Sequence, residues 1–230
     1  MRQIVGTRVE MIRARKENIS ILDVGGGSRT PIPVEEPRTL TTIDISAEQL
    51  EKNAIADEKI LGDVETYDFG DRRYDIVSFW DVLEHLNQPG ETLSRMANLL
   101  NDDGLLVIKG PITSSTKGLI TRFTPHAVHV LFYRHILGSE HAGKPGYAPW
   151  PVEFKPGSDL RSIMRYIKAN DLHVLMQIRF EIWHVAKLRE KSRVLSWLYS
   201  LGNGVLRLVS AGRLGGKATD FVIVASRQQN

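Results

Sequence analysis

Two acidic residues and a glycine cluster have types and spacing that could hold a ribonucleotide. The apolar segment 19–24 contains Asp23 and leads into three glycines that begin at Gly25. Glycines at the carboxyl end of a strand adopt positive φ and let a ligand approach the bare backbone. Asp44 ends the next apolar run, nineteen residues after Gly25, about where an acid binds a ribose diol in dinucleotide folds. A plain tight turn is the alternative interpretation of the glycines.

The glycine spacing discriminates between kinds of nucleotide fold. The nicotinamide fingerprint G-x-G-x-x-G needs a third glycine where this chain has Thr30, so that fingerprint fails. The pattern D-x-G-x-G is matched through Asp23, Gly25 and Gly27. Here the chain resembles the class I S-adenosylmethionine-dependent methyltransferases. The resemblance covers residues 18–111 and includes a Val-Leu-Glu-His-Leu motif similar to that of a small-molecule methyltransferase subgroup.

The resemblance implies an α/β fold, a Rossmann-like, seven-stranded, mostly parallel sheet with helices on both faces, plus helical insertions. We expect residues 1–230 to form a single methyltransferase domain. Two segments lie outside the shared pattern, at about 112–157 and 183–218. The first contains prolines and aromatic residues and is predicted to be a lid or substrate region. The second is predicted to be a basic, apolar helical segment.

The resemblance also implies S-adenosylmethionine as cofactor, and it assigns roles to individual residues. Asp23, Gly25 and Gly27 would face the methionine part of the cofactor. Asp44 would accept hydrogen bonds from the ribose hydroxyls, and Ile45 would pack on the adenine. An exposed turn aspartate is the alternative for Asp44.

Further contacts are implied at the ends of the next two strands. Asp63 would accept from the adenine amino group, with the backbone of Val64 nearby, although Asp63 is also a plausible turn residue after a glycine. Trp80 ends the apolar run 74–80, where the family places contacts to the cofactor. A core tryptophan is the alternative for Trp80.

His85 is the one candidate catalytic residue. The cofactor carries both the methyl group and its leaving group, so the protein must mainly align donor and acceptor. A base is needed only if the acceptor must lose a proton. Histidine titrates near neutrality and suits that task, and the resemblance places His85 near the methyl group. The alternative is that His85 only begins a helix and packs locally.

The predicted function is therefore methyl transfer to an oxygen or nitrogen of a small-molecule acceptor. A lipid-, quinone- or glycan-linked acceptor is compatible with the apolar and basic segment 183–218. One alternative is a binding or scaffold protein that keeps the nucleotide fold without turnover. The other is a nicotinamide-dependent oxidoreductase, against which the missing third glycine argues. No metal site is predicted, because His126 and His129 lack a carboxylate at matching spacing.

Composition limits the other possibilities. Apolar residues make up 42% of the 230 residues, enough for a full core. The chain has no cysteine, which excludes disulfides and thiolate catalysis. The charged segment 1–16 is not typical of a signal peptide, and no apolar run has the length of a membrane span. We therefore expect a cytoplasmic protein that could also associate peripherally with a membrane.

Positive charge is concentrated in one segment. The formal net charge is +3, yet residues 185–217 hold seven basic residues and one acid. Within this segment, polar residues recur every three or four positions on an otherwise apolar helix, namely Arg193, Ser196, Ser200, Asn203, Arg207 and Ser210. Such a helix could lie at a membrane surface, in a homodimer, or on the domain's own core. Nucleic acid is disfavoured, because the basic residues are interleaved with aliphatic ones.

The hydrophobic pattern predicts the remaining elements. A helix over residues 1–16 should lie beside the first strand. No regular helix is expected over residues 28–38, because three prolines lie there. Ser46 should cap a helix that runs to about Ala56, and Ser158 should cap another that runs to about Asn170. Further helices are expected at 90–100, 127–137 and 158–170, a turn at 101–104, a break at Gly202 and Gly204, and strands at 60–61, 74–80, 105–108, 172–180 and 220–225.

Overall fold

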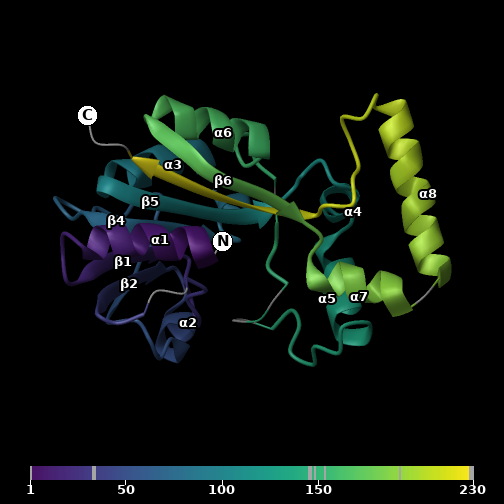
Figure 1. Cartoon of the computed structure of the whole chain (residues 1–230). Coiled ribbons are helices and arrows are strands. Elements are labelled where there is room, and N and C mark those ends of the chain that lie inside the picture. The colour runs from purple at the N-terminus through teal and green to yellow at the C-terminus, as the bar shows by residue number, and fades with distance from the viewer. Residues whose placement is uncertain are drawn as a thin grey trace. The chain divides into compact units, whose positions relative to one another are not determined.

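A seven-stranded sheet organises the computed structural model, which describes residues 2–32, 35–144, 147, 149–152, 154–191 and 193–227. The strand order is β3-β2-β1-β4-β5-β7-β6, and β7 runs opposite to its neighbours (Figure 1). The strands are β1 (Ile19–Val24), β2 (Arg38–Asp44), β3 (Glu58–Leu61), β4 (Tyr74–Trp80), β5 (Leu100–Pro111), β6 (Leu172–Phe180) and β7 (Asp220–Arg227). The predicted Rossmann-like, mostly parallel sheet is confirmed.

The central strands are long apolar runs because both of their faces are covered. Six of the seven residues of β4 are buried, and only Trp80 at its end is half-buried. Parallel strands buried on both faces are typically apolar throughout. In the parallel register, Val24 at the end of β1 lies beside Ile43 of β2 and Phe79 of β4. The carboxyl ends of β1, β2 and β4 therefore form one continuous edge.

The helices of the described residues are α1 (Arg2–Arg13), α2 (Ala47–Lys52), the 3-10 helix η1 (Leu83–His85), α3 (Pro89–Asn98), α4 (Thr116–Phe123), α5 (His126–His135), α6 (Leu160–Ala169), α7 (Trp183–Lys191) and α8 (Arg193–Val209). The expected contact of α1 with β1 is confirmed, α2 contacts β2, and α3 contacts α6 (Figure 1). The ring of Tyr166 in α6 packs directly against Gly90 of α3. A Cβ at this position would lie 2.2 Å from the ring, so α3 and α6 pack closely only because residue 90 has no side chain.

The link from β1 to β2 contains no helix in its described part, as the prolines predicted. The next helix, α2, is shorter than predicted and ends at Lys52 instead of continuing to Ala56. Asn53 causes this difference. Its backbone is extended, and its side-chain oxygen accepts from the backbone N–H groups of Ile55 (3.2 Å) and Ala56 (3.1 Å). A side chain that satisfies the following amides replaces the next helical turn.

The turn predicted at residues 101–104 was wrong. These residues belong to β5, which begins at Leu100. Tyr74 pairs with Leu100 and Ile76 pairs with Leu105, with an irregularity between them. The extra residues therefore bulge out of the strand without ending it.

Two helix predictions also need correction, and one helix was missed. Asp159, and not Ser158, caps α6, because its carboxylate accepts from the amides of Arg161 (3.0 Å) and Ser162 (3.1 Å). Helix α4, capped by Ser115, was not predicted. Helix α8 continues through both of its glycines, so the expected break is absent from this described helix.

The chain divides into two compact units. Unit 1 comprises residues 1–110, 155–178 and 222–230, and unit 2 comprises residues 111–154 and 179–221. The two stretches of unit 2 include most of the segments predicted as insertions. The prediction that all 230 residues form a single methyltransferase domain stays a prediction.

Candidate functional site

The predicted cofactor residues of unit 1 lie at the carboxyl edge of four neighbouring strands. In sheet order, Asp63 follows β3, Asp44 ends β2, Gly25 follows β1 and Trp80 ends β4. Ligands of open α/β sheets bind outside this edge. The fold thus brings together residues separated by more than fifty positions in the sequence.

The glycine turn has backbone conformations that favour glycine. Gly25 has φ +64° and Gly27 has φ +42°, a region that L-residues with side chains rarely adopt. The N–H of Gly25 donates to the carbonyl of Ile43 at 2.8 Å, which joins the turn to the end of β2. A Cβ on Gly25 would lie 2.5 Å from Cγ2 of Val82. The turn is therefore held closely between β2 and the segment that follows β4.

Asn53 holds the other end of this turn, a role that the sequence analysis missed. Its buried side-chain amide donates to the carbonyl of Gly27 at 3.0 Å. Because no helix follows the glycines in the described part of the link, this hydrogen bond fixes a carbonyl that would otherwise need another donor. A buried asparagine just after a short helix is a weak sequence signal, since asparagine is common at helix ends.

Asp23 lies beneath the turn and is completely buried. The hydroxyl of Ser78 donates to its Oδ1, while Oδ2 has no hydrogen-bond partner among the described residues. Burial raises the pKa of Asp23 from 3.8 to about 6, although the nearby hydroxyls of Ser78 and Thr30 oppose the rise. The negative charge of Asp44 adds to it. An unpaired oxygen in this position can accept a hydrogen bond from a ligand or a water molecule.

Asp44 and Ile45 lie directly beside the glycine turn. Oδ1 of Asp44 accepts from the amide of Ser46 at 2.9 Å, and Oδ2 lies 3.2 Å from the position of a Cβ on Gly27. Ile45 is 77% exposed, and Leu61 at the neighbouring end of β3 is 61% exposed. Two exposed aliphatic side chains beside a carboxylate suit a ligand with an apolar ring and hydroxyl groups.

Asp63 takes part in a local turn. Its Oδ1 accepts from the amide of Glu65 at 2.8 Å, a contact that agrees with the turn interpretation and leaves Oδ2 for another donor. The Val64 side chain is buried. Both residues stand at the same edge as Asp44, so the arrangement is compatible with the predicted adenine contacts.

Trp80 is half-buried and precedes a charged pair at the end of β4. Asp81 has φ +57°, which is unfavourable for a residue other than glycine. Its carboxylate forms an ion pair with the ammonium of Lys109, whose side chain is 6% exposed. The sequence analysis missed Lys109. A lysine at the end of the apolar run 105–108 was the available signal, because a buried lysine needs a partner.

His85 ends η1, and its side chain is exposed. Its amide donates to the carbonyl of Val82 at 2.9 Å, and Val82 is the residue that contacts the glycine turn. The predicted catalytic residue therefore lies in the segment beside Gly25, at an exposed position.

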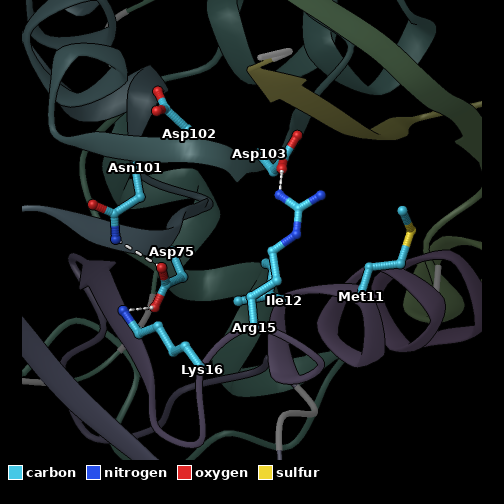
Figure 2. Close-up of a pocket in the computed structure, with 8 residues that line it drawn as sticks. All are labelled: Met11, Ile12, Arg15, Lys16, Asp75, Asn101, Asp102 and Asp103. Atoms are coloured by element: carbon cyan, nitrogen blue, oxygen red, sulfur yellow. Dashed lines mark hydrogen bonds and ion pairs between the residues drawn. The ribbon is translucent and has the colours of Figure 1, made fainter.

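A cavity of about 360 Å³ lies elsewhere in unit 1, beside α1 and the amino-terminal ends of β4 and β5 (Figure 2). Asp75 lines this cavity and is almost completely buried. It accepts from Lys16 (2.7 Å), Asn101 (2.7 Å) and the amide of Ser20 (2.8 Å). These contacts lower the pKa of Asp75 against the opposing effect of burial. The carboxylate is fully used within the protein, so this cavity has a structural polar cluster and not a candidate active site.

The carboxyl edge fits S-adenosylmethionine in three respects. The glycine backbone offers close approach, the buried Asp23 oxygen has no partner among the described residues, and Asp44 stands beside exposed aliphatic side chains. One feature differs from the usual arrangement. A helix N-terminus normally follows the glycines, whereas here Asn53 braces the turn. No group of three or more metal-ligating side chains occurs within the described ranges.

Comparison with known protein families shows to which nucleotide-binding family the chain belongs. Residues 2–185 match the family described as a methyltransferase domain. The chain belongs to this family. The family and fold class expected from the sequence are therefore confirmed, and with them S-adenosylmethionine as the cofactor of this methyltransferase domain. A search of curated proteins found no match.

Solved structures share the fold at low sequence identity. A methyltransferase from Methanosarcina mazei is 16% identical, with 96% of this chain and 98% of that chain covered and a TM-score of 0.52. A putative sarcosine dimethylglycine methyltransferase from Galdieria sulphuraria is 14% identical, with 98% and 84% covered and a TM-score of 0.56. A magnesium protoporphyrin IX methyltransferase from Synechocystis, solved with bound S-adenosylmethionine, is 11% identical, with 99% and 79% covered and a TM-score of 0.50. These neighbours support the fold of this methyltransferase domain.

Proposed function

We propose that this methyltransferase domain transfers a methyl group to an oxygen or nitrogen of a small-molecule acceptor, with the cofactor held at the carboxyl edge of β1, β2, β3 and β4. The observation that carries the proposal is the glycine turn at Gly25 and Gly27, which lies against the Asp44 carboxylate. When bound, S-adenosylmethionine supplies an electrophilic methyl group together with its leaving group. The protein supplies binding, alignment and the exclusion of water.

Each residue has a distinct task in this proposal. The backbone of the glycine turn receives the methionine part, and the unpaired Asp23 oxygen lies beneath it. Asp44 accepts from the ribose hydroxyls through Oδ2, because Oδ1 is engaged by Ser46. Ile45 covers one face of the adenine, and its 77% exposed side chain is available for this contact.

The remaining predicted contacts lie at either side. Asp63 accepts from the adenine amino group through Oδ2, with the Val64 backbone beside it, and Trp80 borders the cofactor from the end of β4. His85 accepts the acceptor's proton if the acceptor is a hydroxyl or an ammonium group. Its exposed ring exchanges that proton directly with solvent. The acceptor contacts are proposed to come from residues 112–157, the predicted lid or substrate region.

Titration calorimetry with S-adenosylhomocysteine tests the cofactor site. We expect micromolar binding of this ligand and no binding of NADH. Replacing Asp44 with Ala removes the ribose acceptor, and a hydrogen bond to a charged group contributes about 1.5–3 kcal/mol, so affinity should fall roughly tenfold or more. The matched control is Asp71→Ala, an exposed aspartate of the same unit, which should bind like the wild type. Wild-type affinity in the Asp44 variant would contradict the ribose role.

A second candidate is a nucleotide-fold binding protein without turnover. The specific observation in its favour is the described part of residues 28–37, which contains no helix to direct an N-terminus at the ligand. Absence of binding for both S-adenosylhomocysteine and NADH would favour this candidate. Binding of NADH alone would instead indicate an oxidoreductase.

A further inference from the structure

Helix α8 is oriented with its polar side inward. Side chains at three- and four-residue spacing lie on one side of a helix. Among the described side chains of α8 and the residue that follows it, those that are buried or half-buried are Ser196, Tyr199, Asn203, Leu206 and Ser210. Four of these five residues are polar. A surface helix of a globular domain normally buries its apolar side, so this orientation is the reverse of the usual one.

Hydrogen bonds within unit 2 hold the polar side in place. Oδ1 of Asn203, which is 9% exposed, accepts from the hydroxyl of Thr116 in α4 at 3.1 Å and from the amide of Gly216. The hydroxyl of Ser210 accepts from the amide of Leu214 at 2.9 Å. The guanidinium of Arg189 in α7 lies 5.3 Å from the ring centre of Tyr199. Rotating α8 would break these contacts, so its orientation is determined by specific partners.

The opposite side of α8 is a continuous apolar face. Its large side chains are between 50% and 83% exposed, and they are Val194, Trp197, Leu198, Leu201, Val205, Leu208 and Val209. Gly202 and Gly204 on the same helix have no atoms within 4 Å of an added Cβ. Soluble proteins rarely expose contiguous apolar surface of this kind unless it binds an apolar partner.

The charge around this face indicates which partner. Residues 193–219 contain no Asp or Glu and include Arg193, Arg207, Arg213 and Lys217. In α7, Lys187 and Lys191 outnumber Glu190, while Arg189 is ion-paired with Glu181. A second copy docked through the same face would bring two strongly positive segments together, which costs free energy. An anionic lipid surface attracts the cations and accepts the apolar side chains at once.

We propose that α8 lies flat on an anionic lipid bilayer, with the apolar face formed by the seven side chains named above inserted at the headgroup boundary. Across the described residues no helix has the length and apolar content needed to cross a membrane, so the contact is interfacial. The proposal is independent of the methyl-transfer reaction. It would, however, bring the enzyme to the surface where a lipid-linked acceptor resides.

Vesicle sedimentation with the full chain tests this proposal. Vesicles of phosphatidylcholine with about one third phosphatidylglycerol should bind the wild type at low salt, and pure phosphatidylcholine vesicles should bind it far less. The triple variant Trp197→Ser, Leu201→Ser, Leu208→Ser removes three large apolar groups and should weaken binding by roughly a hundredfold. The double variant Arg193→Gln, Arg207→Gln should weaken it roughly tenfold.

The matched control is the triple variant Met11→Ser, Ile55→Ser, Val174→Ser, which changes exposed apolar residues of unit 1 and should bind like the wild type. Circular dichroism checks that each variant is folded. A wild type that ignores anionic vesicles, or an α8 triple variant that binds as well as the wild type, would overturn the proposal. The proposal would also be overturned, in favour of a second copy, if the wild type does not bind vesicles but is a dimer in light scattering and the α8 triple variant is a monomer.

Discussion

Replacing Gly25 with Ala tests the close packing of the glycine turn. At φ +64° an alanine loses about 1–2 kcal/mol of stability from backbone strain alone. Its Cβ would also lie 2.5 Å from Cγ2 of Val82, and overpacking of this kind costs about 1–3 kcal/mol. The expected total is about 2–5 kcal/mol of unfolding free energy, measured by urea denaturation followed by circular dichroism.

Two further variants separate these contributions. Gly70 has φ +56° with no atom within 4 Å of an added Cβ, so Gly70→Ala should cost only about 1–2 kcal/mol from the backbone. In a Val82→Ala background, the nearest Val82 atom left is Cβ at 3.5 Å, an ordinary contact. There Gly25→Ala should cost no more than Gly70→Ala does.

The double-mutant cycle gives a clear refutation. The coupling between Gly25→Ala and Val82→Ala should favour the double variant by about 1–3 kcal/mol, which is the clash removed. If Gly25→Ala costs no more than Gly70→Ala, or if the two changes are additive, the turn does not lie against Val82 as described. The packing argument for the cofactor site would then fail.

Three other outcomes follow from the structure. The pKa of Asp23 rises from 3.8 to about 6 on folding, so protonation of Asp23 stabilises the folded state fully below about pH 3.8, and this stabilisation is lost as pH rises through 6. The unfolding free energy of the wild type, measured by urea titration, should therefore fall by up to about 3 kcal/mol across that range, and Asp23→Asn should abolish this fall. An unchanged pH dependence in the variant would contradict the assignment. Asp81 has φ +57°, so Asp81→Gly should be about 1 kcal/mol more stable than Asp81→Ala, although both lose the Lys109 pair, and equal thermal unfolding would argue against the strain. Asn203→Ala removes an acceptor shared by Thr116 and Gly216, so it should speed amide hydrogen exchange in α8. Ser200→Ala changes an exposed position of the same helix and should leave this exchange unchanged. Equal exchange rates in the two variants would refute the anchoring role of Asn203.

Patterns that depend on local sequence were predicted well. The nearly continuous apolar run from Tyr74 to Trp80 gave the limits of β4, since a strand buried on both faces is mostly apolar. Its two polar residues, Asp75 and Ser78, are buried with hydrogen-bond partners. Ser46 caps α2 as expected, with its hydroxyl accepting from the amide of Gln49 at 3.3 Å. The prolines after the glycine turn correctly excluded a helix from the described part of this link, because proline lacks the amide hydrogen that a helix interior needs.

Features that depend on distant contacts were not predicted. Asn53 ends α2 and binds Gly27, twenty-six residues earlier, and nothing in the neighbouring sequence indicates that partner. Lys109 directly follows the strand predicted at 105–108, but its role depends on Asp81, which follows the neighbouring strand β4. The polar residues of this segment were recognised as a stripe, yet the sequence did not reveal that only Ser196, Asn203 and Ser210 of the stripe face inward. The inward position of Asn203 depends on its contacts with Thr116 and Gly216.

The position of β7 in the sheet has a consequence for synthesis on the ribosome. β7 lies between β5 and β6, and it follows both of them and α8 in the chain. While the chain emerges, β5 and β6 therefore each present an open edge, and unpaired edges can recruit foreign strands. The apolar face of α8 is also translated before β7 can pair with β5 and β6. The nascent chain is thus most prone to aggregation just before β7 emerges, and holding by a chaperone or early contact with a membrane would be of most use at that stage.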